Sequence, residues 1–235
     1  MIARLRNKLT RTGLYILAPL LRYLNQLPYD FPADPKAVLK IKLADIDFFL
    51  EDNIARQKSI PGMIVNQRWE PNMTPARYIL SVSLKNKGLK EHFEEGVPWI
   101  KTSLFQERYA PLLKDGRKVR GCRTLSQLEG YYRKYDDLYR ELRENGICVG
   151  SDAKKIEPIY IHIGPEGEII FTSNGNHRLY IARILEIGEF PVMVWWRHER
   201  WQRKRDECFR LGKSQFFEVY PNLKNHPDLQ DVPDG

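Results

Sequence analysis

The sequence predicts an α+β protein, with a mainly helical N-terminal half and a small mixed sheet with helices in the C-terminal half. Apolar residues recur at alternating steps of three and four over residues 125–145, which is typical of an amphipathic helix. After residue 156, short runs rich in Ile, Val and aromatic residues predict strands. Hydrophobic residues make up 42% and charged residues 29% of the 235, as in ordinary folded proteins.

We divide the chain into four segments by composition and pattern. These are a basic N-terminal segment at 1–35, a mainly helical region at 36–150, a sheet domain at 151–213 and a loose tail at 214–235. The tail is assigned because it is polar and punctuated by proline from Asn222 onward.

The first 24 residues carry five basic side chains and no acid: Arg4, Arg6, Lys8, Arg11 and Arg22. The apolar run at 13–21 is interrupted by Pro19 and is far shorter than the roughly 20 residues of a membrane-spanning helix. No signal-peptide cleavage pattern follows it. Two alternatives stay open, a basic amphipathic helix that contacts a membrane and a helix packed on the protein's own core.

Residues 36–150 contain one strongly predicted helix and several weaker elements. The pattern predicts a strand with a turn or short helix at 38–50, a loop and short strand at 60–70, and a helix at 104–113. For the helix at 125–145, Thr124 with Gln127 fits a capping box, and Gly146 fits a C-terminal cap. We interpret its aromatic stripe as core packing.

The C-terminal half alternates strands and helices. We expect strands at 158–163, 168–172 and 191–196, with a hairpin turn at 164–167. One helix is expected from His177 to Ile187 with Gly188 as its cap, and a basic helix at 197–211. Cys122, Cys148 and Cys208 lack the C-x-x-C spacing of a zinc or redox site, so we expect a reducing compartment, the cytoplasm.

The loop between the second strand and the following helix is the main candidate site. A glycine-containing turn that opens a helix presents unpaired N–H groups and the positive end of the helix dipole. Gly175 permits close backbone approach, and His177 and Arg178 can donate to phosphate oxygens. An ordinary turn with a helix cap is the alternative. The sequence therefore predicts a nucleotide-phosphate site that consists of Ser173, Asn174, Gly175, Asn176, His177 and Arg178.

Over residues 156–196 the chain resembles the ParB/sulfiredoxin superfamily, whose members carry a Gly-x-x-Arg loop between a strand and a helix. Residues 175–178 correspond to Gly-Cys-His-Arg in sulfiredoxins and to Gly-Glu-x-Arg in partition proteins. Residues 174–178 are also similar to the Asp-Gly-His-His-Arg loop of free serine kinases. The resemblance implies a ParB/sulfiredoxin-like sheet and a nucleotide ligand (ATP, ADP or CTP), with Mg²⁺ as a candidate companion ion.

The resemblance extends to Trp69-Glu70 and to Arg197-His198-x-x-Trp201, which are similar to segments of ParB-like proteins of prokaryotes and viruses. Two departures from the family pattern limit the chemistry. Asn176 replaces the sulfiredoxin cysteine, which excludes a thiol nucleophile at this position. Asn176 also replaces the partition-protein glutamate, and no helix-turn-helix module is evident, so the sequence argues against a role in chromosome partition. Asn174 replaces the kinase aspartate, so the acid/base residue of that branch is missing.

No catalytic residue is assigned, and the candidates are Glu157, His177 and His198. Arg197, with His198 and Arg200 at the end of the third strand, is expected to line the phosphate site, against the alternative of a solvated helix start. The hairpin carboxylates Glu166 and Glu168 are either ligands or ordinary turn residues. His162 is expected to be a packed core histidine.

We therefore expect a nucleotide-binding protein, a phosphotransferase or a nucleotide hydrolase. Two alternatives come from other classes. The first is a nucleic-acid-binding module that uses residues 197–213. This segment contains seven Lys and Arg side chains and three acidic ones, and Trp195, Trp196 and Trp201 lie in or next to it in the sequence. The second is a membrane-associated adaptor, peripherally bound through residues 1–24.

Overall fold

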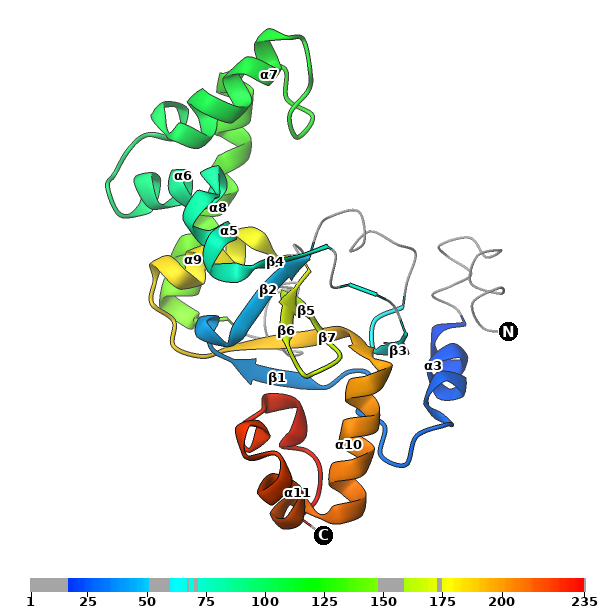
Figure 1. The fold of residues 1–235 in the computed structure, drawn as a ribbon. Coiled ribbons are helices and arrows are strands. Elements are labelled where there is room, and N and C mark those ends of the chain that lie inside the picture. Colours follow the sequence, from blue (N-terminus) through cyan, green and yellow to red (C-terminus); the bar gives the residue numbers. More distant parts are fainter. Residues whose placement is uncertain are drawn as a thin grey trace. The chain divides into compact units, whose positions relative to one another are not determined.

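The structure, a computed structural model, describes residues 17–50, 60–66, 68–69, 72–147, 159–172 and 175–234 (Figure 1). It is an α+β protein, as the sequence predicts, and it divides into two compact units. Unit 1 is Met1–Thr74, Pro158–Asn174 and Pro191–Gly235, and unit 2 is Pro75–Glu157 and Gly175–Phe190. The chain therefore passes repeatedly from one unit to the other, whereas composition predicts consecutive segments.

Unit 1 contains a mixed sheet of seven described strands in the order β1-β7-β5-β6-β2-β4, with β3 also paired to β7. β5 runs antiparallel to β6 and parallel to β7, while β2 is parallel to β6 and β3 is parallel to β7. The strands are β1 Val38–Ile41, β2 Ile46–Leu50, β3 Met63–Val65, β4 Met73–Pro75, β5 Ile159–Ile163, β6 Ile169–Phe171 and β7 Phe190–His198.

Four of these strands lie between residues 38 and 75, at the start of the region predicted to be mainly helical at 36–150, and the described α-helices of that region begin at Ala76. β1 alternates exposed and buried residues, which is the period of a strand. A short 3₁₀ turn, Leu43–Asp45, separates β1 from β2. The predicted strand with a turn at 38–50 is confirmed, and β2 belongs to the same sheet as the C-terminal strands.

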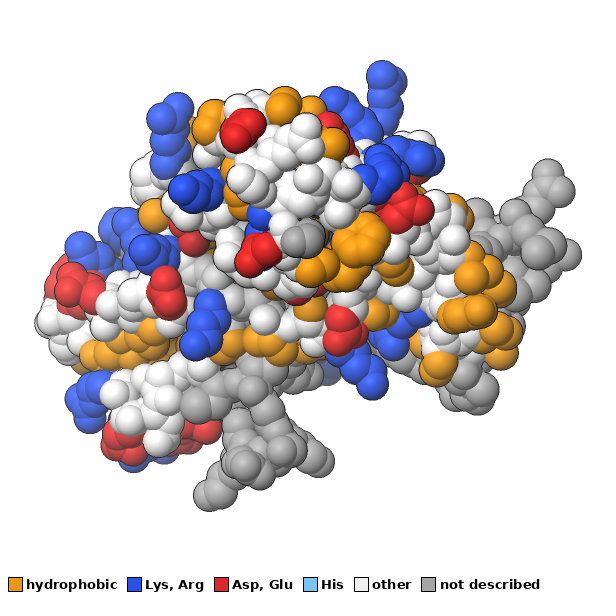
Figure 2. Space-filling view, turned by 90° about the horizontal axis from the view of Figure 1, so that it is seen from below, with side chains coloured by type: hydrophobic (Ala, Val, Ile, Leu, Met, Phe, Trp, Pro, Cys, Tyr) orange, Lys and Arg blue, Asp and Glu red, His pale blue; other side chains and the backbone are white. Residues whose placement is uncertain are grey.

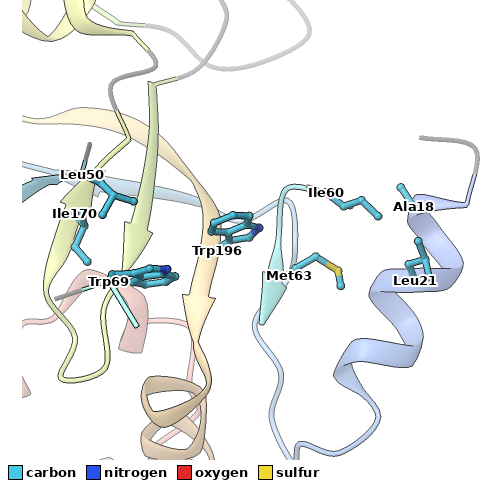
Figure 3. Packing of buried hydrophobic residues seen from close by; sticks show 8 residues of the cluster. All are labelled: Ala18, Leu21, Leu50, Ile60, Met63, Trp69, Ile170 and Trp196. Atoms are coloured by element: carbon cyan, nitrogen blue, oxygen red, sulfur yellow. The ribbon is translucent and has the colours of Figure 1, made fainter. Parts of the chain in front are cut away.

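The helix α3, Ala18–Gln26, lies beside β3 (Figure 1). Its Ala18 and Leu21 point toward Ile60 and Met63, in a core cluster that extends to Trp196 of β7 (Figure 3). The Asn25 side chain pairs with both backbone groups of Ile64, donating from Nδ2 to the carbonyl at 2.9 Å and accepting the amide at 2.7 Å. No described helix has the length and apolarity to cross a membrane.

The C-terminal part of unit 1 is ordered by packing, so the predicted loose tail is wrong. β7 continues through Arg197 and His198, and the basic helix α10, Glu199–Leu211, begins two residues later than predicted. His198 is its N-cap and accepts the Arg200 amide on Nδ1 at 3.1 Å. α11, Lys213–Val219, and two 3₁₀ turns, Pro221–Leu223 and Pro227–Leu229, follow. Leu229 and Val232 are buried, which fixes the end of the chain.

The longest described helix of unit 2 is α8, Leu125–Asn145, and its predicted bounds are confirmed. Thr124 accepts the Gln127 amide at its start, and Gly146 ends it with φ 66°. Leu128, Tyr132, Tyr135 and Leu142 of its stripe are buried, which confirms core packing. The other helices are α5 Ala76–Val82, α6 Leu84–Phe93, α7 Ala110–Lys114 and α9 Asn176–Ile184, with a 3₁₀ turn at Trp99–Lys101.

Two predicted helices of unit 2 differ in detail. The one at 104–113 is a π-helical turn, Leu104–Tyr109, followed by α7, because Pro111 has no amide hydrogen and the bonding register changes beside it. α9 ends at Ile184, and not near Gly188. Glu186, with φ 52°, takes the left-handed position after the helix, and the Ile187 amide bonds to the Ala182 carbonyl at 2.9 Å.

Candidate functional site

The first turn of α9 is the candidate anion site in unit 2. Gly175 is the N-cap in a left-handed conformation with φ 98°, and as a glycine it brings no side chain to the amides of the first turn. Asn176, His177 and Arg178 are the first three residues of the helix. Their N–H groups have no carbonyl four residues earlier within the helix, and the helix dipole adds positive potential. This end of α9 therefore favours an anion.

The His177 imidazole stands at the centre of the site. Its ring stacks on Tyr135 of α8, with centroids 3.9 Å apart and planes 15° from parallel, and it meets Tyr132 edge-on at 6.1 Å. Its Nε2 is buried and has no hydrogen-bond partner among the described residues. A buried polar atom without a partner costs free energy unless a ligand or water satisfies it. Nε2 is therefore a group that a ligand can satisfy.

Four basic side chains act electrostatically on this ring and define what we call the His177 cation cluster: Lys85 of α6, Arg120, Lys134 of α8 and Arg178. Burial, followed by these four cations, lowers the pKa of His177 to about 2. Every charged group among these causes is a cation. The imidazole is therefore neutral at physiological pH in a region of positive potential.

Two tyrosines of α8 extend the site. The Lys134 ammonium lies 3.5 Å from the centroid of the Tyr131 ring and 5.1 Å from that of Tyr135. The Lys134 hydrogen bond lowers the pKa of the Tyr131 phenol, whereas burial raises that of Tyr135. Tyr131 is half-buried, so part of its ring is open to solvent. Aromatic surface beside cations is the combination that binds a base together with its phosphates.

The structure describes only part of the predicted site. Ser173, Asn174 and the candidate catalytic residue Glu157 lie outside the described residues, as does Cys148. Gly175, Asn176, His177 and Arg178 open α9 in unit 2, as predicted for a helix start. Of the hairpin carboxylates, Glu166 pairs with Arg200, and Glu168 accepts the Glu166 amide at 2.9 Å, which is the behaviour of turn residues.

Arg197 and His198 belong to unit 1, in different surroundings from those predicted. The Arg197 guanidinium is 2% exposed and binds the Asp228 carboxylate through Nε and Nη2, at 3.0 and 2.7 Å. Its anion is therefore a side chain of the protein. Burial alone would raise the pKa of Asp228, but Arg197 and Arg205 lower it below its usual value. His198 is buried and packs edge-on against Trp69 at 5.6 Å.

The remaining bases of segment 197–213 also have carboxylate partners. Arg205 is fully buried and bonds both Asp231 oxygens at 2.9 and 2.8 Å. The exposed bases form the pairs Arg200–Glu166, Arg203–Glu199, Lys204–Glu207, Arg210–Asp30 and Lys213–Asp234. A groove of about 390 Å³ along α10 is lined by four of these bases and two of their acids. The charge that the sequence places on this helix is thus largely neutralised in the fold.

Sequence reasoning missed Lys85, Arg120 and Lys134, because nothing in the order of residues brings them to the α9 loop. It did identify Tyr135, but as a core residue only. Among the described residues, no group of three His, Cys, Asp or Glu side chains could hold a metal ion. No protein-family model, no curated protein and no solved structure matches the chain, so the site is interpreted from its own geometry.

Proposed function

We propose that unit 2 binds a phosphate-bearing ligand at the start of α9, and that this ligand is a nucleotide. The observation that carries the proposal is the state of His177, a neutral buried imidazole whose pKa is lowered by four cations and whose Nε2 is unsatisfied by the described residues. Like charges gathered in one place repel one another and destabilise the folded state. An anion placed among them removes that cost and satisfies the helix amides.

The proposed division of roles follows from where each group lies. The first-turn amides and Arg178 contact phosphate oxygens, because Arg offers several donors in a fixed plane. Lys85, Arg120 and Lys134 supply positive potential, and His177 donates from Nε2 to a phosphate oxygen. The open part of the Tyr131 ring suits a nucleobase. The resemblance of residues 174–178 to superfamily phosphate loops adds ATP, ADP and CTP as the nucleotides to test first.

Phosphotransfer or nucleotide hydrolysis in the cytoplasm is the finer part of the proposal. Without a cluster of metal ligands among the described residues, Mg²⁺ would be carried mainly by the phosphates of the nucleotide, as is common for this ion. With its pKa lowered to about 2 and its Nε2 donating to phosphate, His177 is a poor general base, so its proposed role is binding. The phosphoryl acceptor is water in a hydrolase and a second substrate in a phosphotransferase. An assay for released inorganic phosphate distinguishes the two, because only the hydrolase releases it as the product.

Thermal unfolding in the presence of nucleotides tests the binding. ATP, ADP, CTP and inorganic tripolyphosphate, each with and without Mg²⁺, should raise the melting temperature, since a ligand at 100 times its Kd stabilises by about 2.7 kcal/mol. Lys134→Ala should reduce that rise strongly. Arg133→Ala is the matched control, because Arg133 is exposed, adjacent on α8 and outside the cation cluster. Absence of a rise with every one of these ligands would refute the proposal.

The nucleic-acid alternative receives less support from the described residues. Its basic helix α10 is balanced by carboxylates, and Trp196 and Trp201 are buried in the core, so they offer no stacking surface. Binding to single-stranded DNA or RNA that weakens steeply with salt, and that charge reversal at the exposed Arg203 abolishes, would restore this alternative. Arg205 is unsuitable for that test, because it is buried and its reversal would disrupt the fold.

A further inference from the structure

The ring of His226 joins two segments of unit 1 that are distant in the sequence. Its Nε2 lies 2.7 Å from the Gly167 carbonyl oxygen, in the hairpin between β5 and β6. Its Nδ1 accepts the Asp228 amide at 3.2 Å, so His226 is the N-cap of the 3₁₀ turn Pro227–Leu229. A carbonyl oxygen can only accept and a backbone amide can only donate. This geometry therefore requires the neutral ring, with its proton on Nε2.

The indole of Trp201 brings the same two segments together. Its ring centroid lies 4.3 Å from that of His226. Gly167 packs against the other part of this contact, because a Cβ added there would lie 2.5 Å from the Trp201 ring. Its φ of 99° is also a conformation that favours glycine. The hairpin backbone, the indole and the imidazole therefore form one close-packed contact, which the His226 hydrogen bonds hold together.

We call residues 226–232 the C-terminal turn. Its two aspartates bind the guanidiniums of Arg197 and Arg205, which are 2% and 0% exposed. Two of its apolar side chains, Leu229 and Val232, are buried. Figure 2, which views the protein from the α11 end of unit 1, shows acidic and basic side chains interspersed on that face. Opening of the C-terminal turn would therefore expose apolar surface and separate two buried cations from their carboxylates.

The charged groups that act on His226 come from three elements. Arg205 lies on α10, Asp47 on β2 and Asp228 in the C-terminal turn, while the hairpin contributes the Gly167 carbonyl. Burial lowers the pKa of His226 below its usual value, and Arg205 acts in the same direction. The two carboxylates and the carbonyl act in the opposite direction but do not outweigh burial. The folded protein therefore favours the neutral ring that the hydrogen bonds require.

We propose that His226 makes the attachment of the C-terminal turn dependent on pH, so that the turn is held while the ring is neutral and opens more often in mild acid. A proton on Nδ1 removes the acceptor of the Asp228 amide and places positive charge where the N–H groups of the 3₁₀ turn point. Because opening lets the ring take up one proton, the opening constant should rise by up to about tenfold per pH unit below about pH 6.5. This device is independent of the proposed nucleotide site, which lies in unit 2.

Amide hydrogen exchange of the full chain tests this proposal, because it measures the opening of individual backbone groups. The amides of Asp228 and Leu229 are followed from about pH 7.5 to about pH 5, across the range in which histidine titrates, and corrected for intrinsic exchange. We expect their opening constants to rise by up to about tenfold per pH unit below about pH 6.5. His226→Asn keeps a side-chain acceptor at the N-cap but binds no proton, so this rise should disappear.

Gln230→Ala is the matched control, because Gln230 donates from Nε2 to the His226 carbonyl at 3.1 Å and does not titrate. It should increase opening by a similar factor at every pH and leave the pH dependence in place. A pH dependence that persists in His226→Asn would overturn the proposal, as would its absence from the unaltered protein. Equal protection of the C-terminal turn and β5 at every pH would also overturn it, because the turn would then open only with the whole unit.

Titration of the His226 ring by NMR in the unaltered protein supplies a result that does not depend on any variant. We expect the pKa of His226 to lie below its usual value, as burial dictates. A pKa at or above about 6.5 would overturn the proposal, because opening would then release a proton or leave proton binding unchanged.

Discussion

The two cationic regions of this protein have similar numbers of basic side chains but opposite electrostatic surroundings. On α10 in unit 1, each base has a carboxylate within 4 Å, some of them in the C-terminal tail. Around His177 in unit 2, the charged groups that lower the pKa of the ring are Lys85, Arg120, Lys134 and Arg178. A count of Lys and Arg along a sequence therefore does not show which basic side chains are balanced by carboxylates. The fold shows it for α10.

The largest expected effect is on the buried pairs of unit 1. Asp228→Asn removes the charge that Arg197 and Arg205 share, and leaves both guanidiniums buried without their full partner. We expect a loss of about 3–5 kcal/mol in the free energy of unfolding, measured by urea denaturation. Asp234→Asn is the control, because Asp234 is 89% exposed and its pair with Lys213 spans 3.4 Å. Similar losses for the two variants would contradict the distinction between buried and surface pairs.

Acid should destabilise unit 1 through His162 of β5. This ring is buried between Trp69 and Trp196, with centroids at 5.2 and 4.8 Å, and burial lowers its pKa to about 3. Because the folded pKa is below the unfolded value, the fold favours the neutral ring. Its contribution is complete above about pH 6.5 and declines as the pH falls toward 3, with about 2 kcal/mol lost by pH 5.

His177 and His226 also have lowered pKa values, so acid sensitivity of the whole protein does not identify His162. The variant His162→Phe keeps an aromatic ring in the same stack but cannot bind a proton. Comparing its urea unfolding with that of the unaltered protein at pH 7 and pH 5 isolates the contribution. An unchanged acid sensitivity in His162→Phe would show that this ring is not the group that titrates.

The exposed ion pair between Arg210 of α10 and Asp30 should contribute less to the free energy of unfolding than the buried groups. Arg210→Gln breaks the contact with Asp30 at 2.6 Å, in which both side chains are more than half exposed. We expect a loss of about half a kcal/mol in the free energy of unfolding, smaller still in high salt. Urea denaturation at low and high NaCl measures it. A gain in stability would mean that this region is not neutralised as described.

The smallest expected change in the free energy of unfolding is a gain in stability, whereas the other variants lose stability. Arg120→Gln removes one member of the His177 cation cluster, and therefore reduces repulsion in the protein without ligand. We expect a gain of a few tenths of a kcal/mol at low salt, which disappears at high salt. The same variant should show a weaker stabilisation by nucleotide. A loss of stability at low salt would indicate that an anion of the protein already neutralises the cluster.

Features of the fold that depend on local signals were predictable. The helix at 125–145 was identified with its bounds, because its period and both caps lie within the segment itself. The opening of α9 by Gly175 was likewise local. Features that depend on distant pairing were not. β2 pairs with β6 through contacts such as Ile46 with Ile169, and nothing near residue 46 indicates that partner.

The candidate site likewise combines residues that the local sequence identifies with residues that come from distant parts of the chain. Residues 175–178 could be identified from the loop, but Lys85 and Arg120 come from other parts of unit 2 and were missed. Arg197 was misjudged for the converse reason, since its buried partner Asp228 lies 31 positions further along the chain. Glu186 was missed because a left-handed helix end usually selects glycine, and here a residue with a side chain occupies it.

The bond pair between Asn25 and Ile64 has a further consequence for the behaviour of the protein in concentrated solution. β3 is hydrogen-bonded to β7 along one side, and its other side would expose the backbone of Ile64 as a template for an added strand. The Asn25 amide imitates the backbone of a neighbouring strand and occupies both groups of Ile64. Asn25 therefore occupies the two backbone groups that an added strand would need at Ile64, in addition to holding α3 in place.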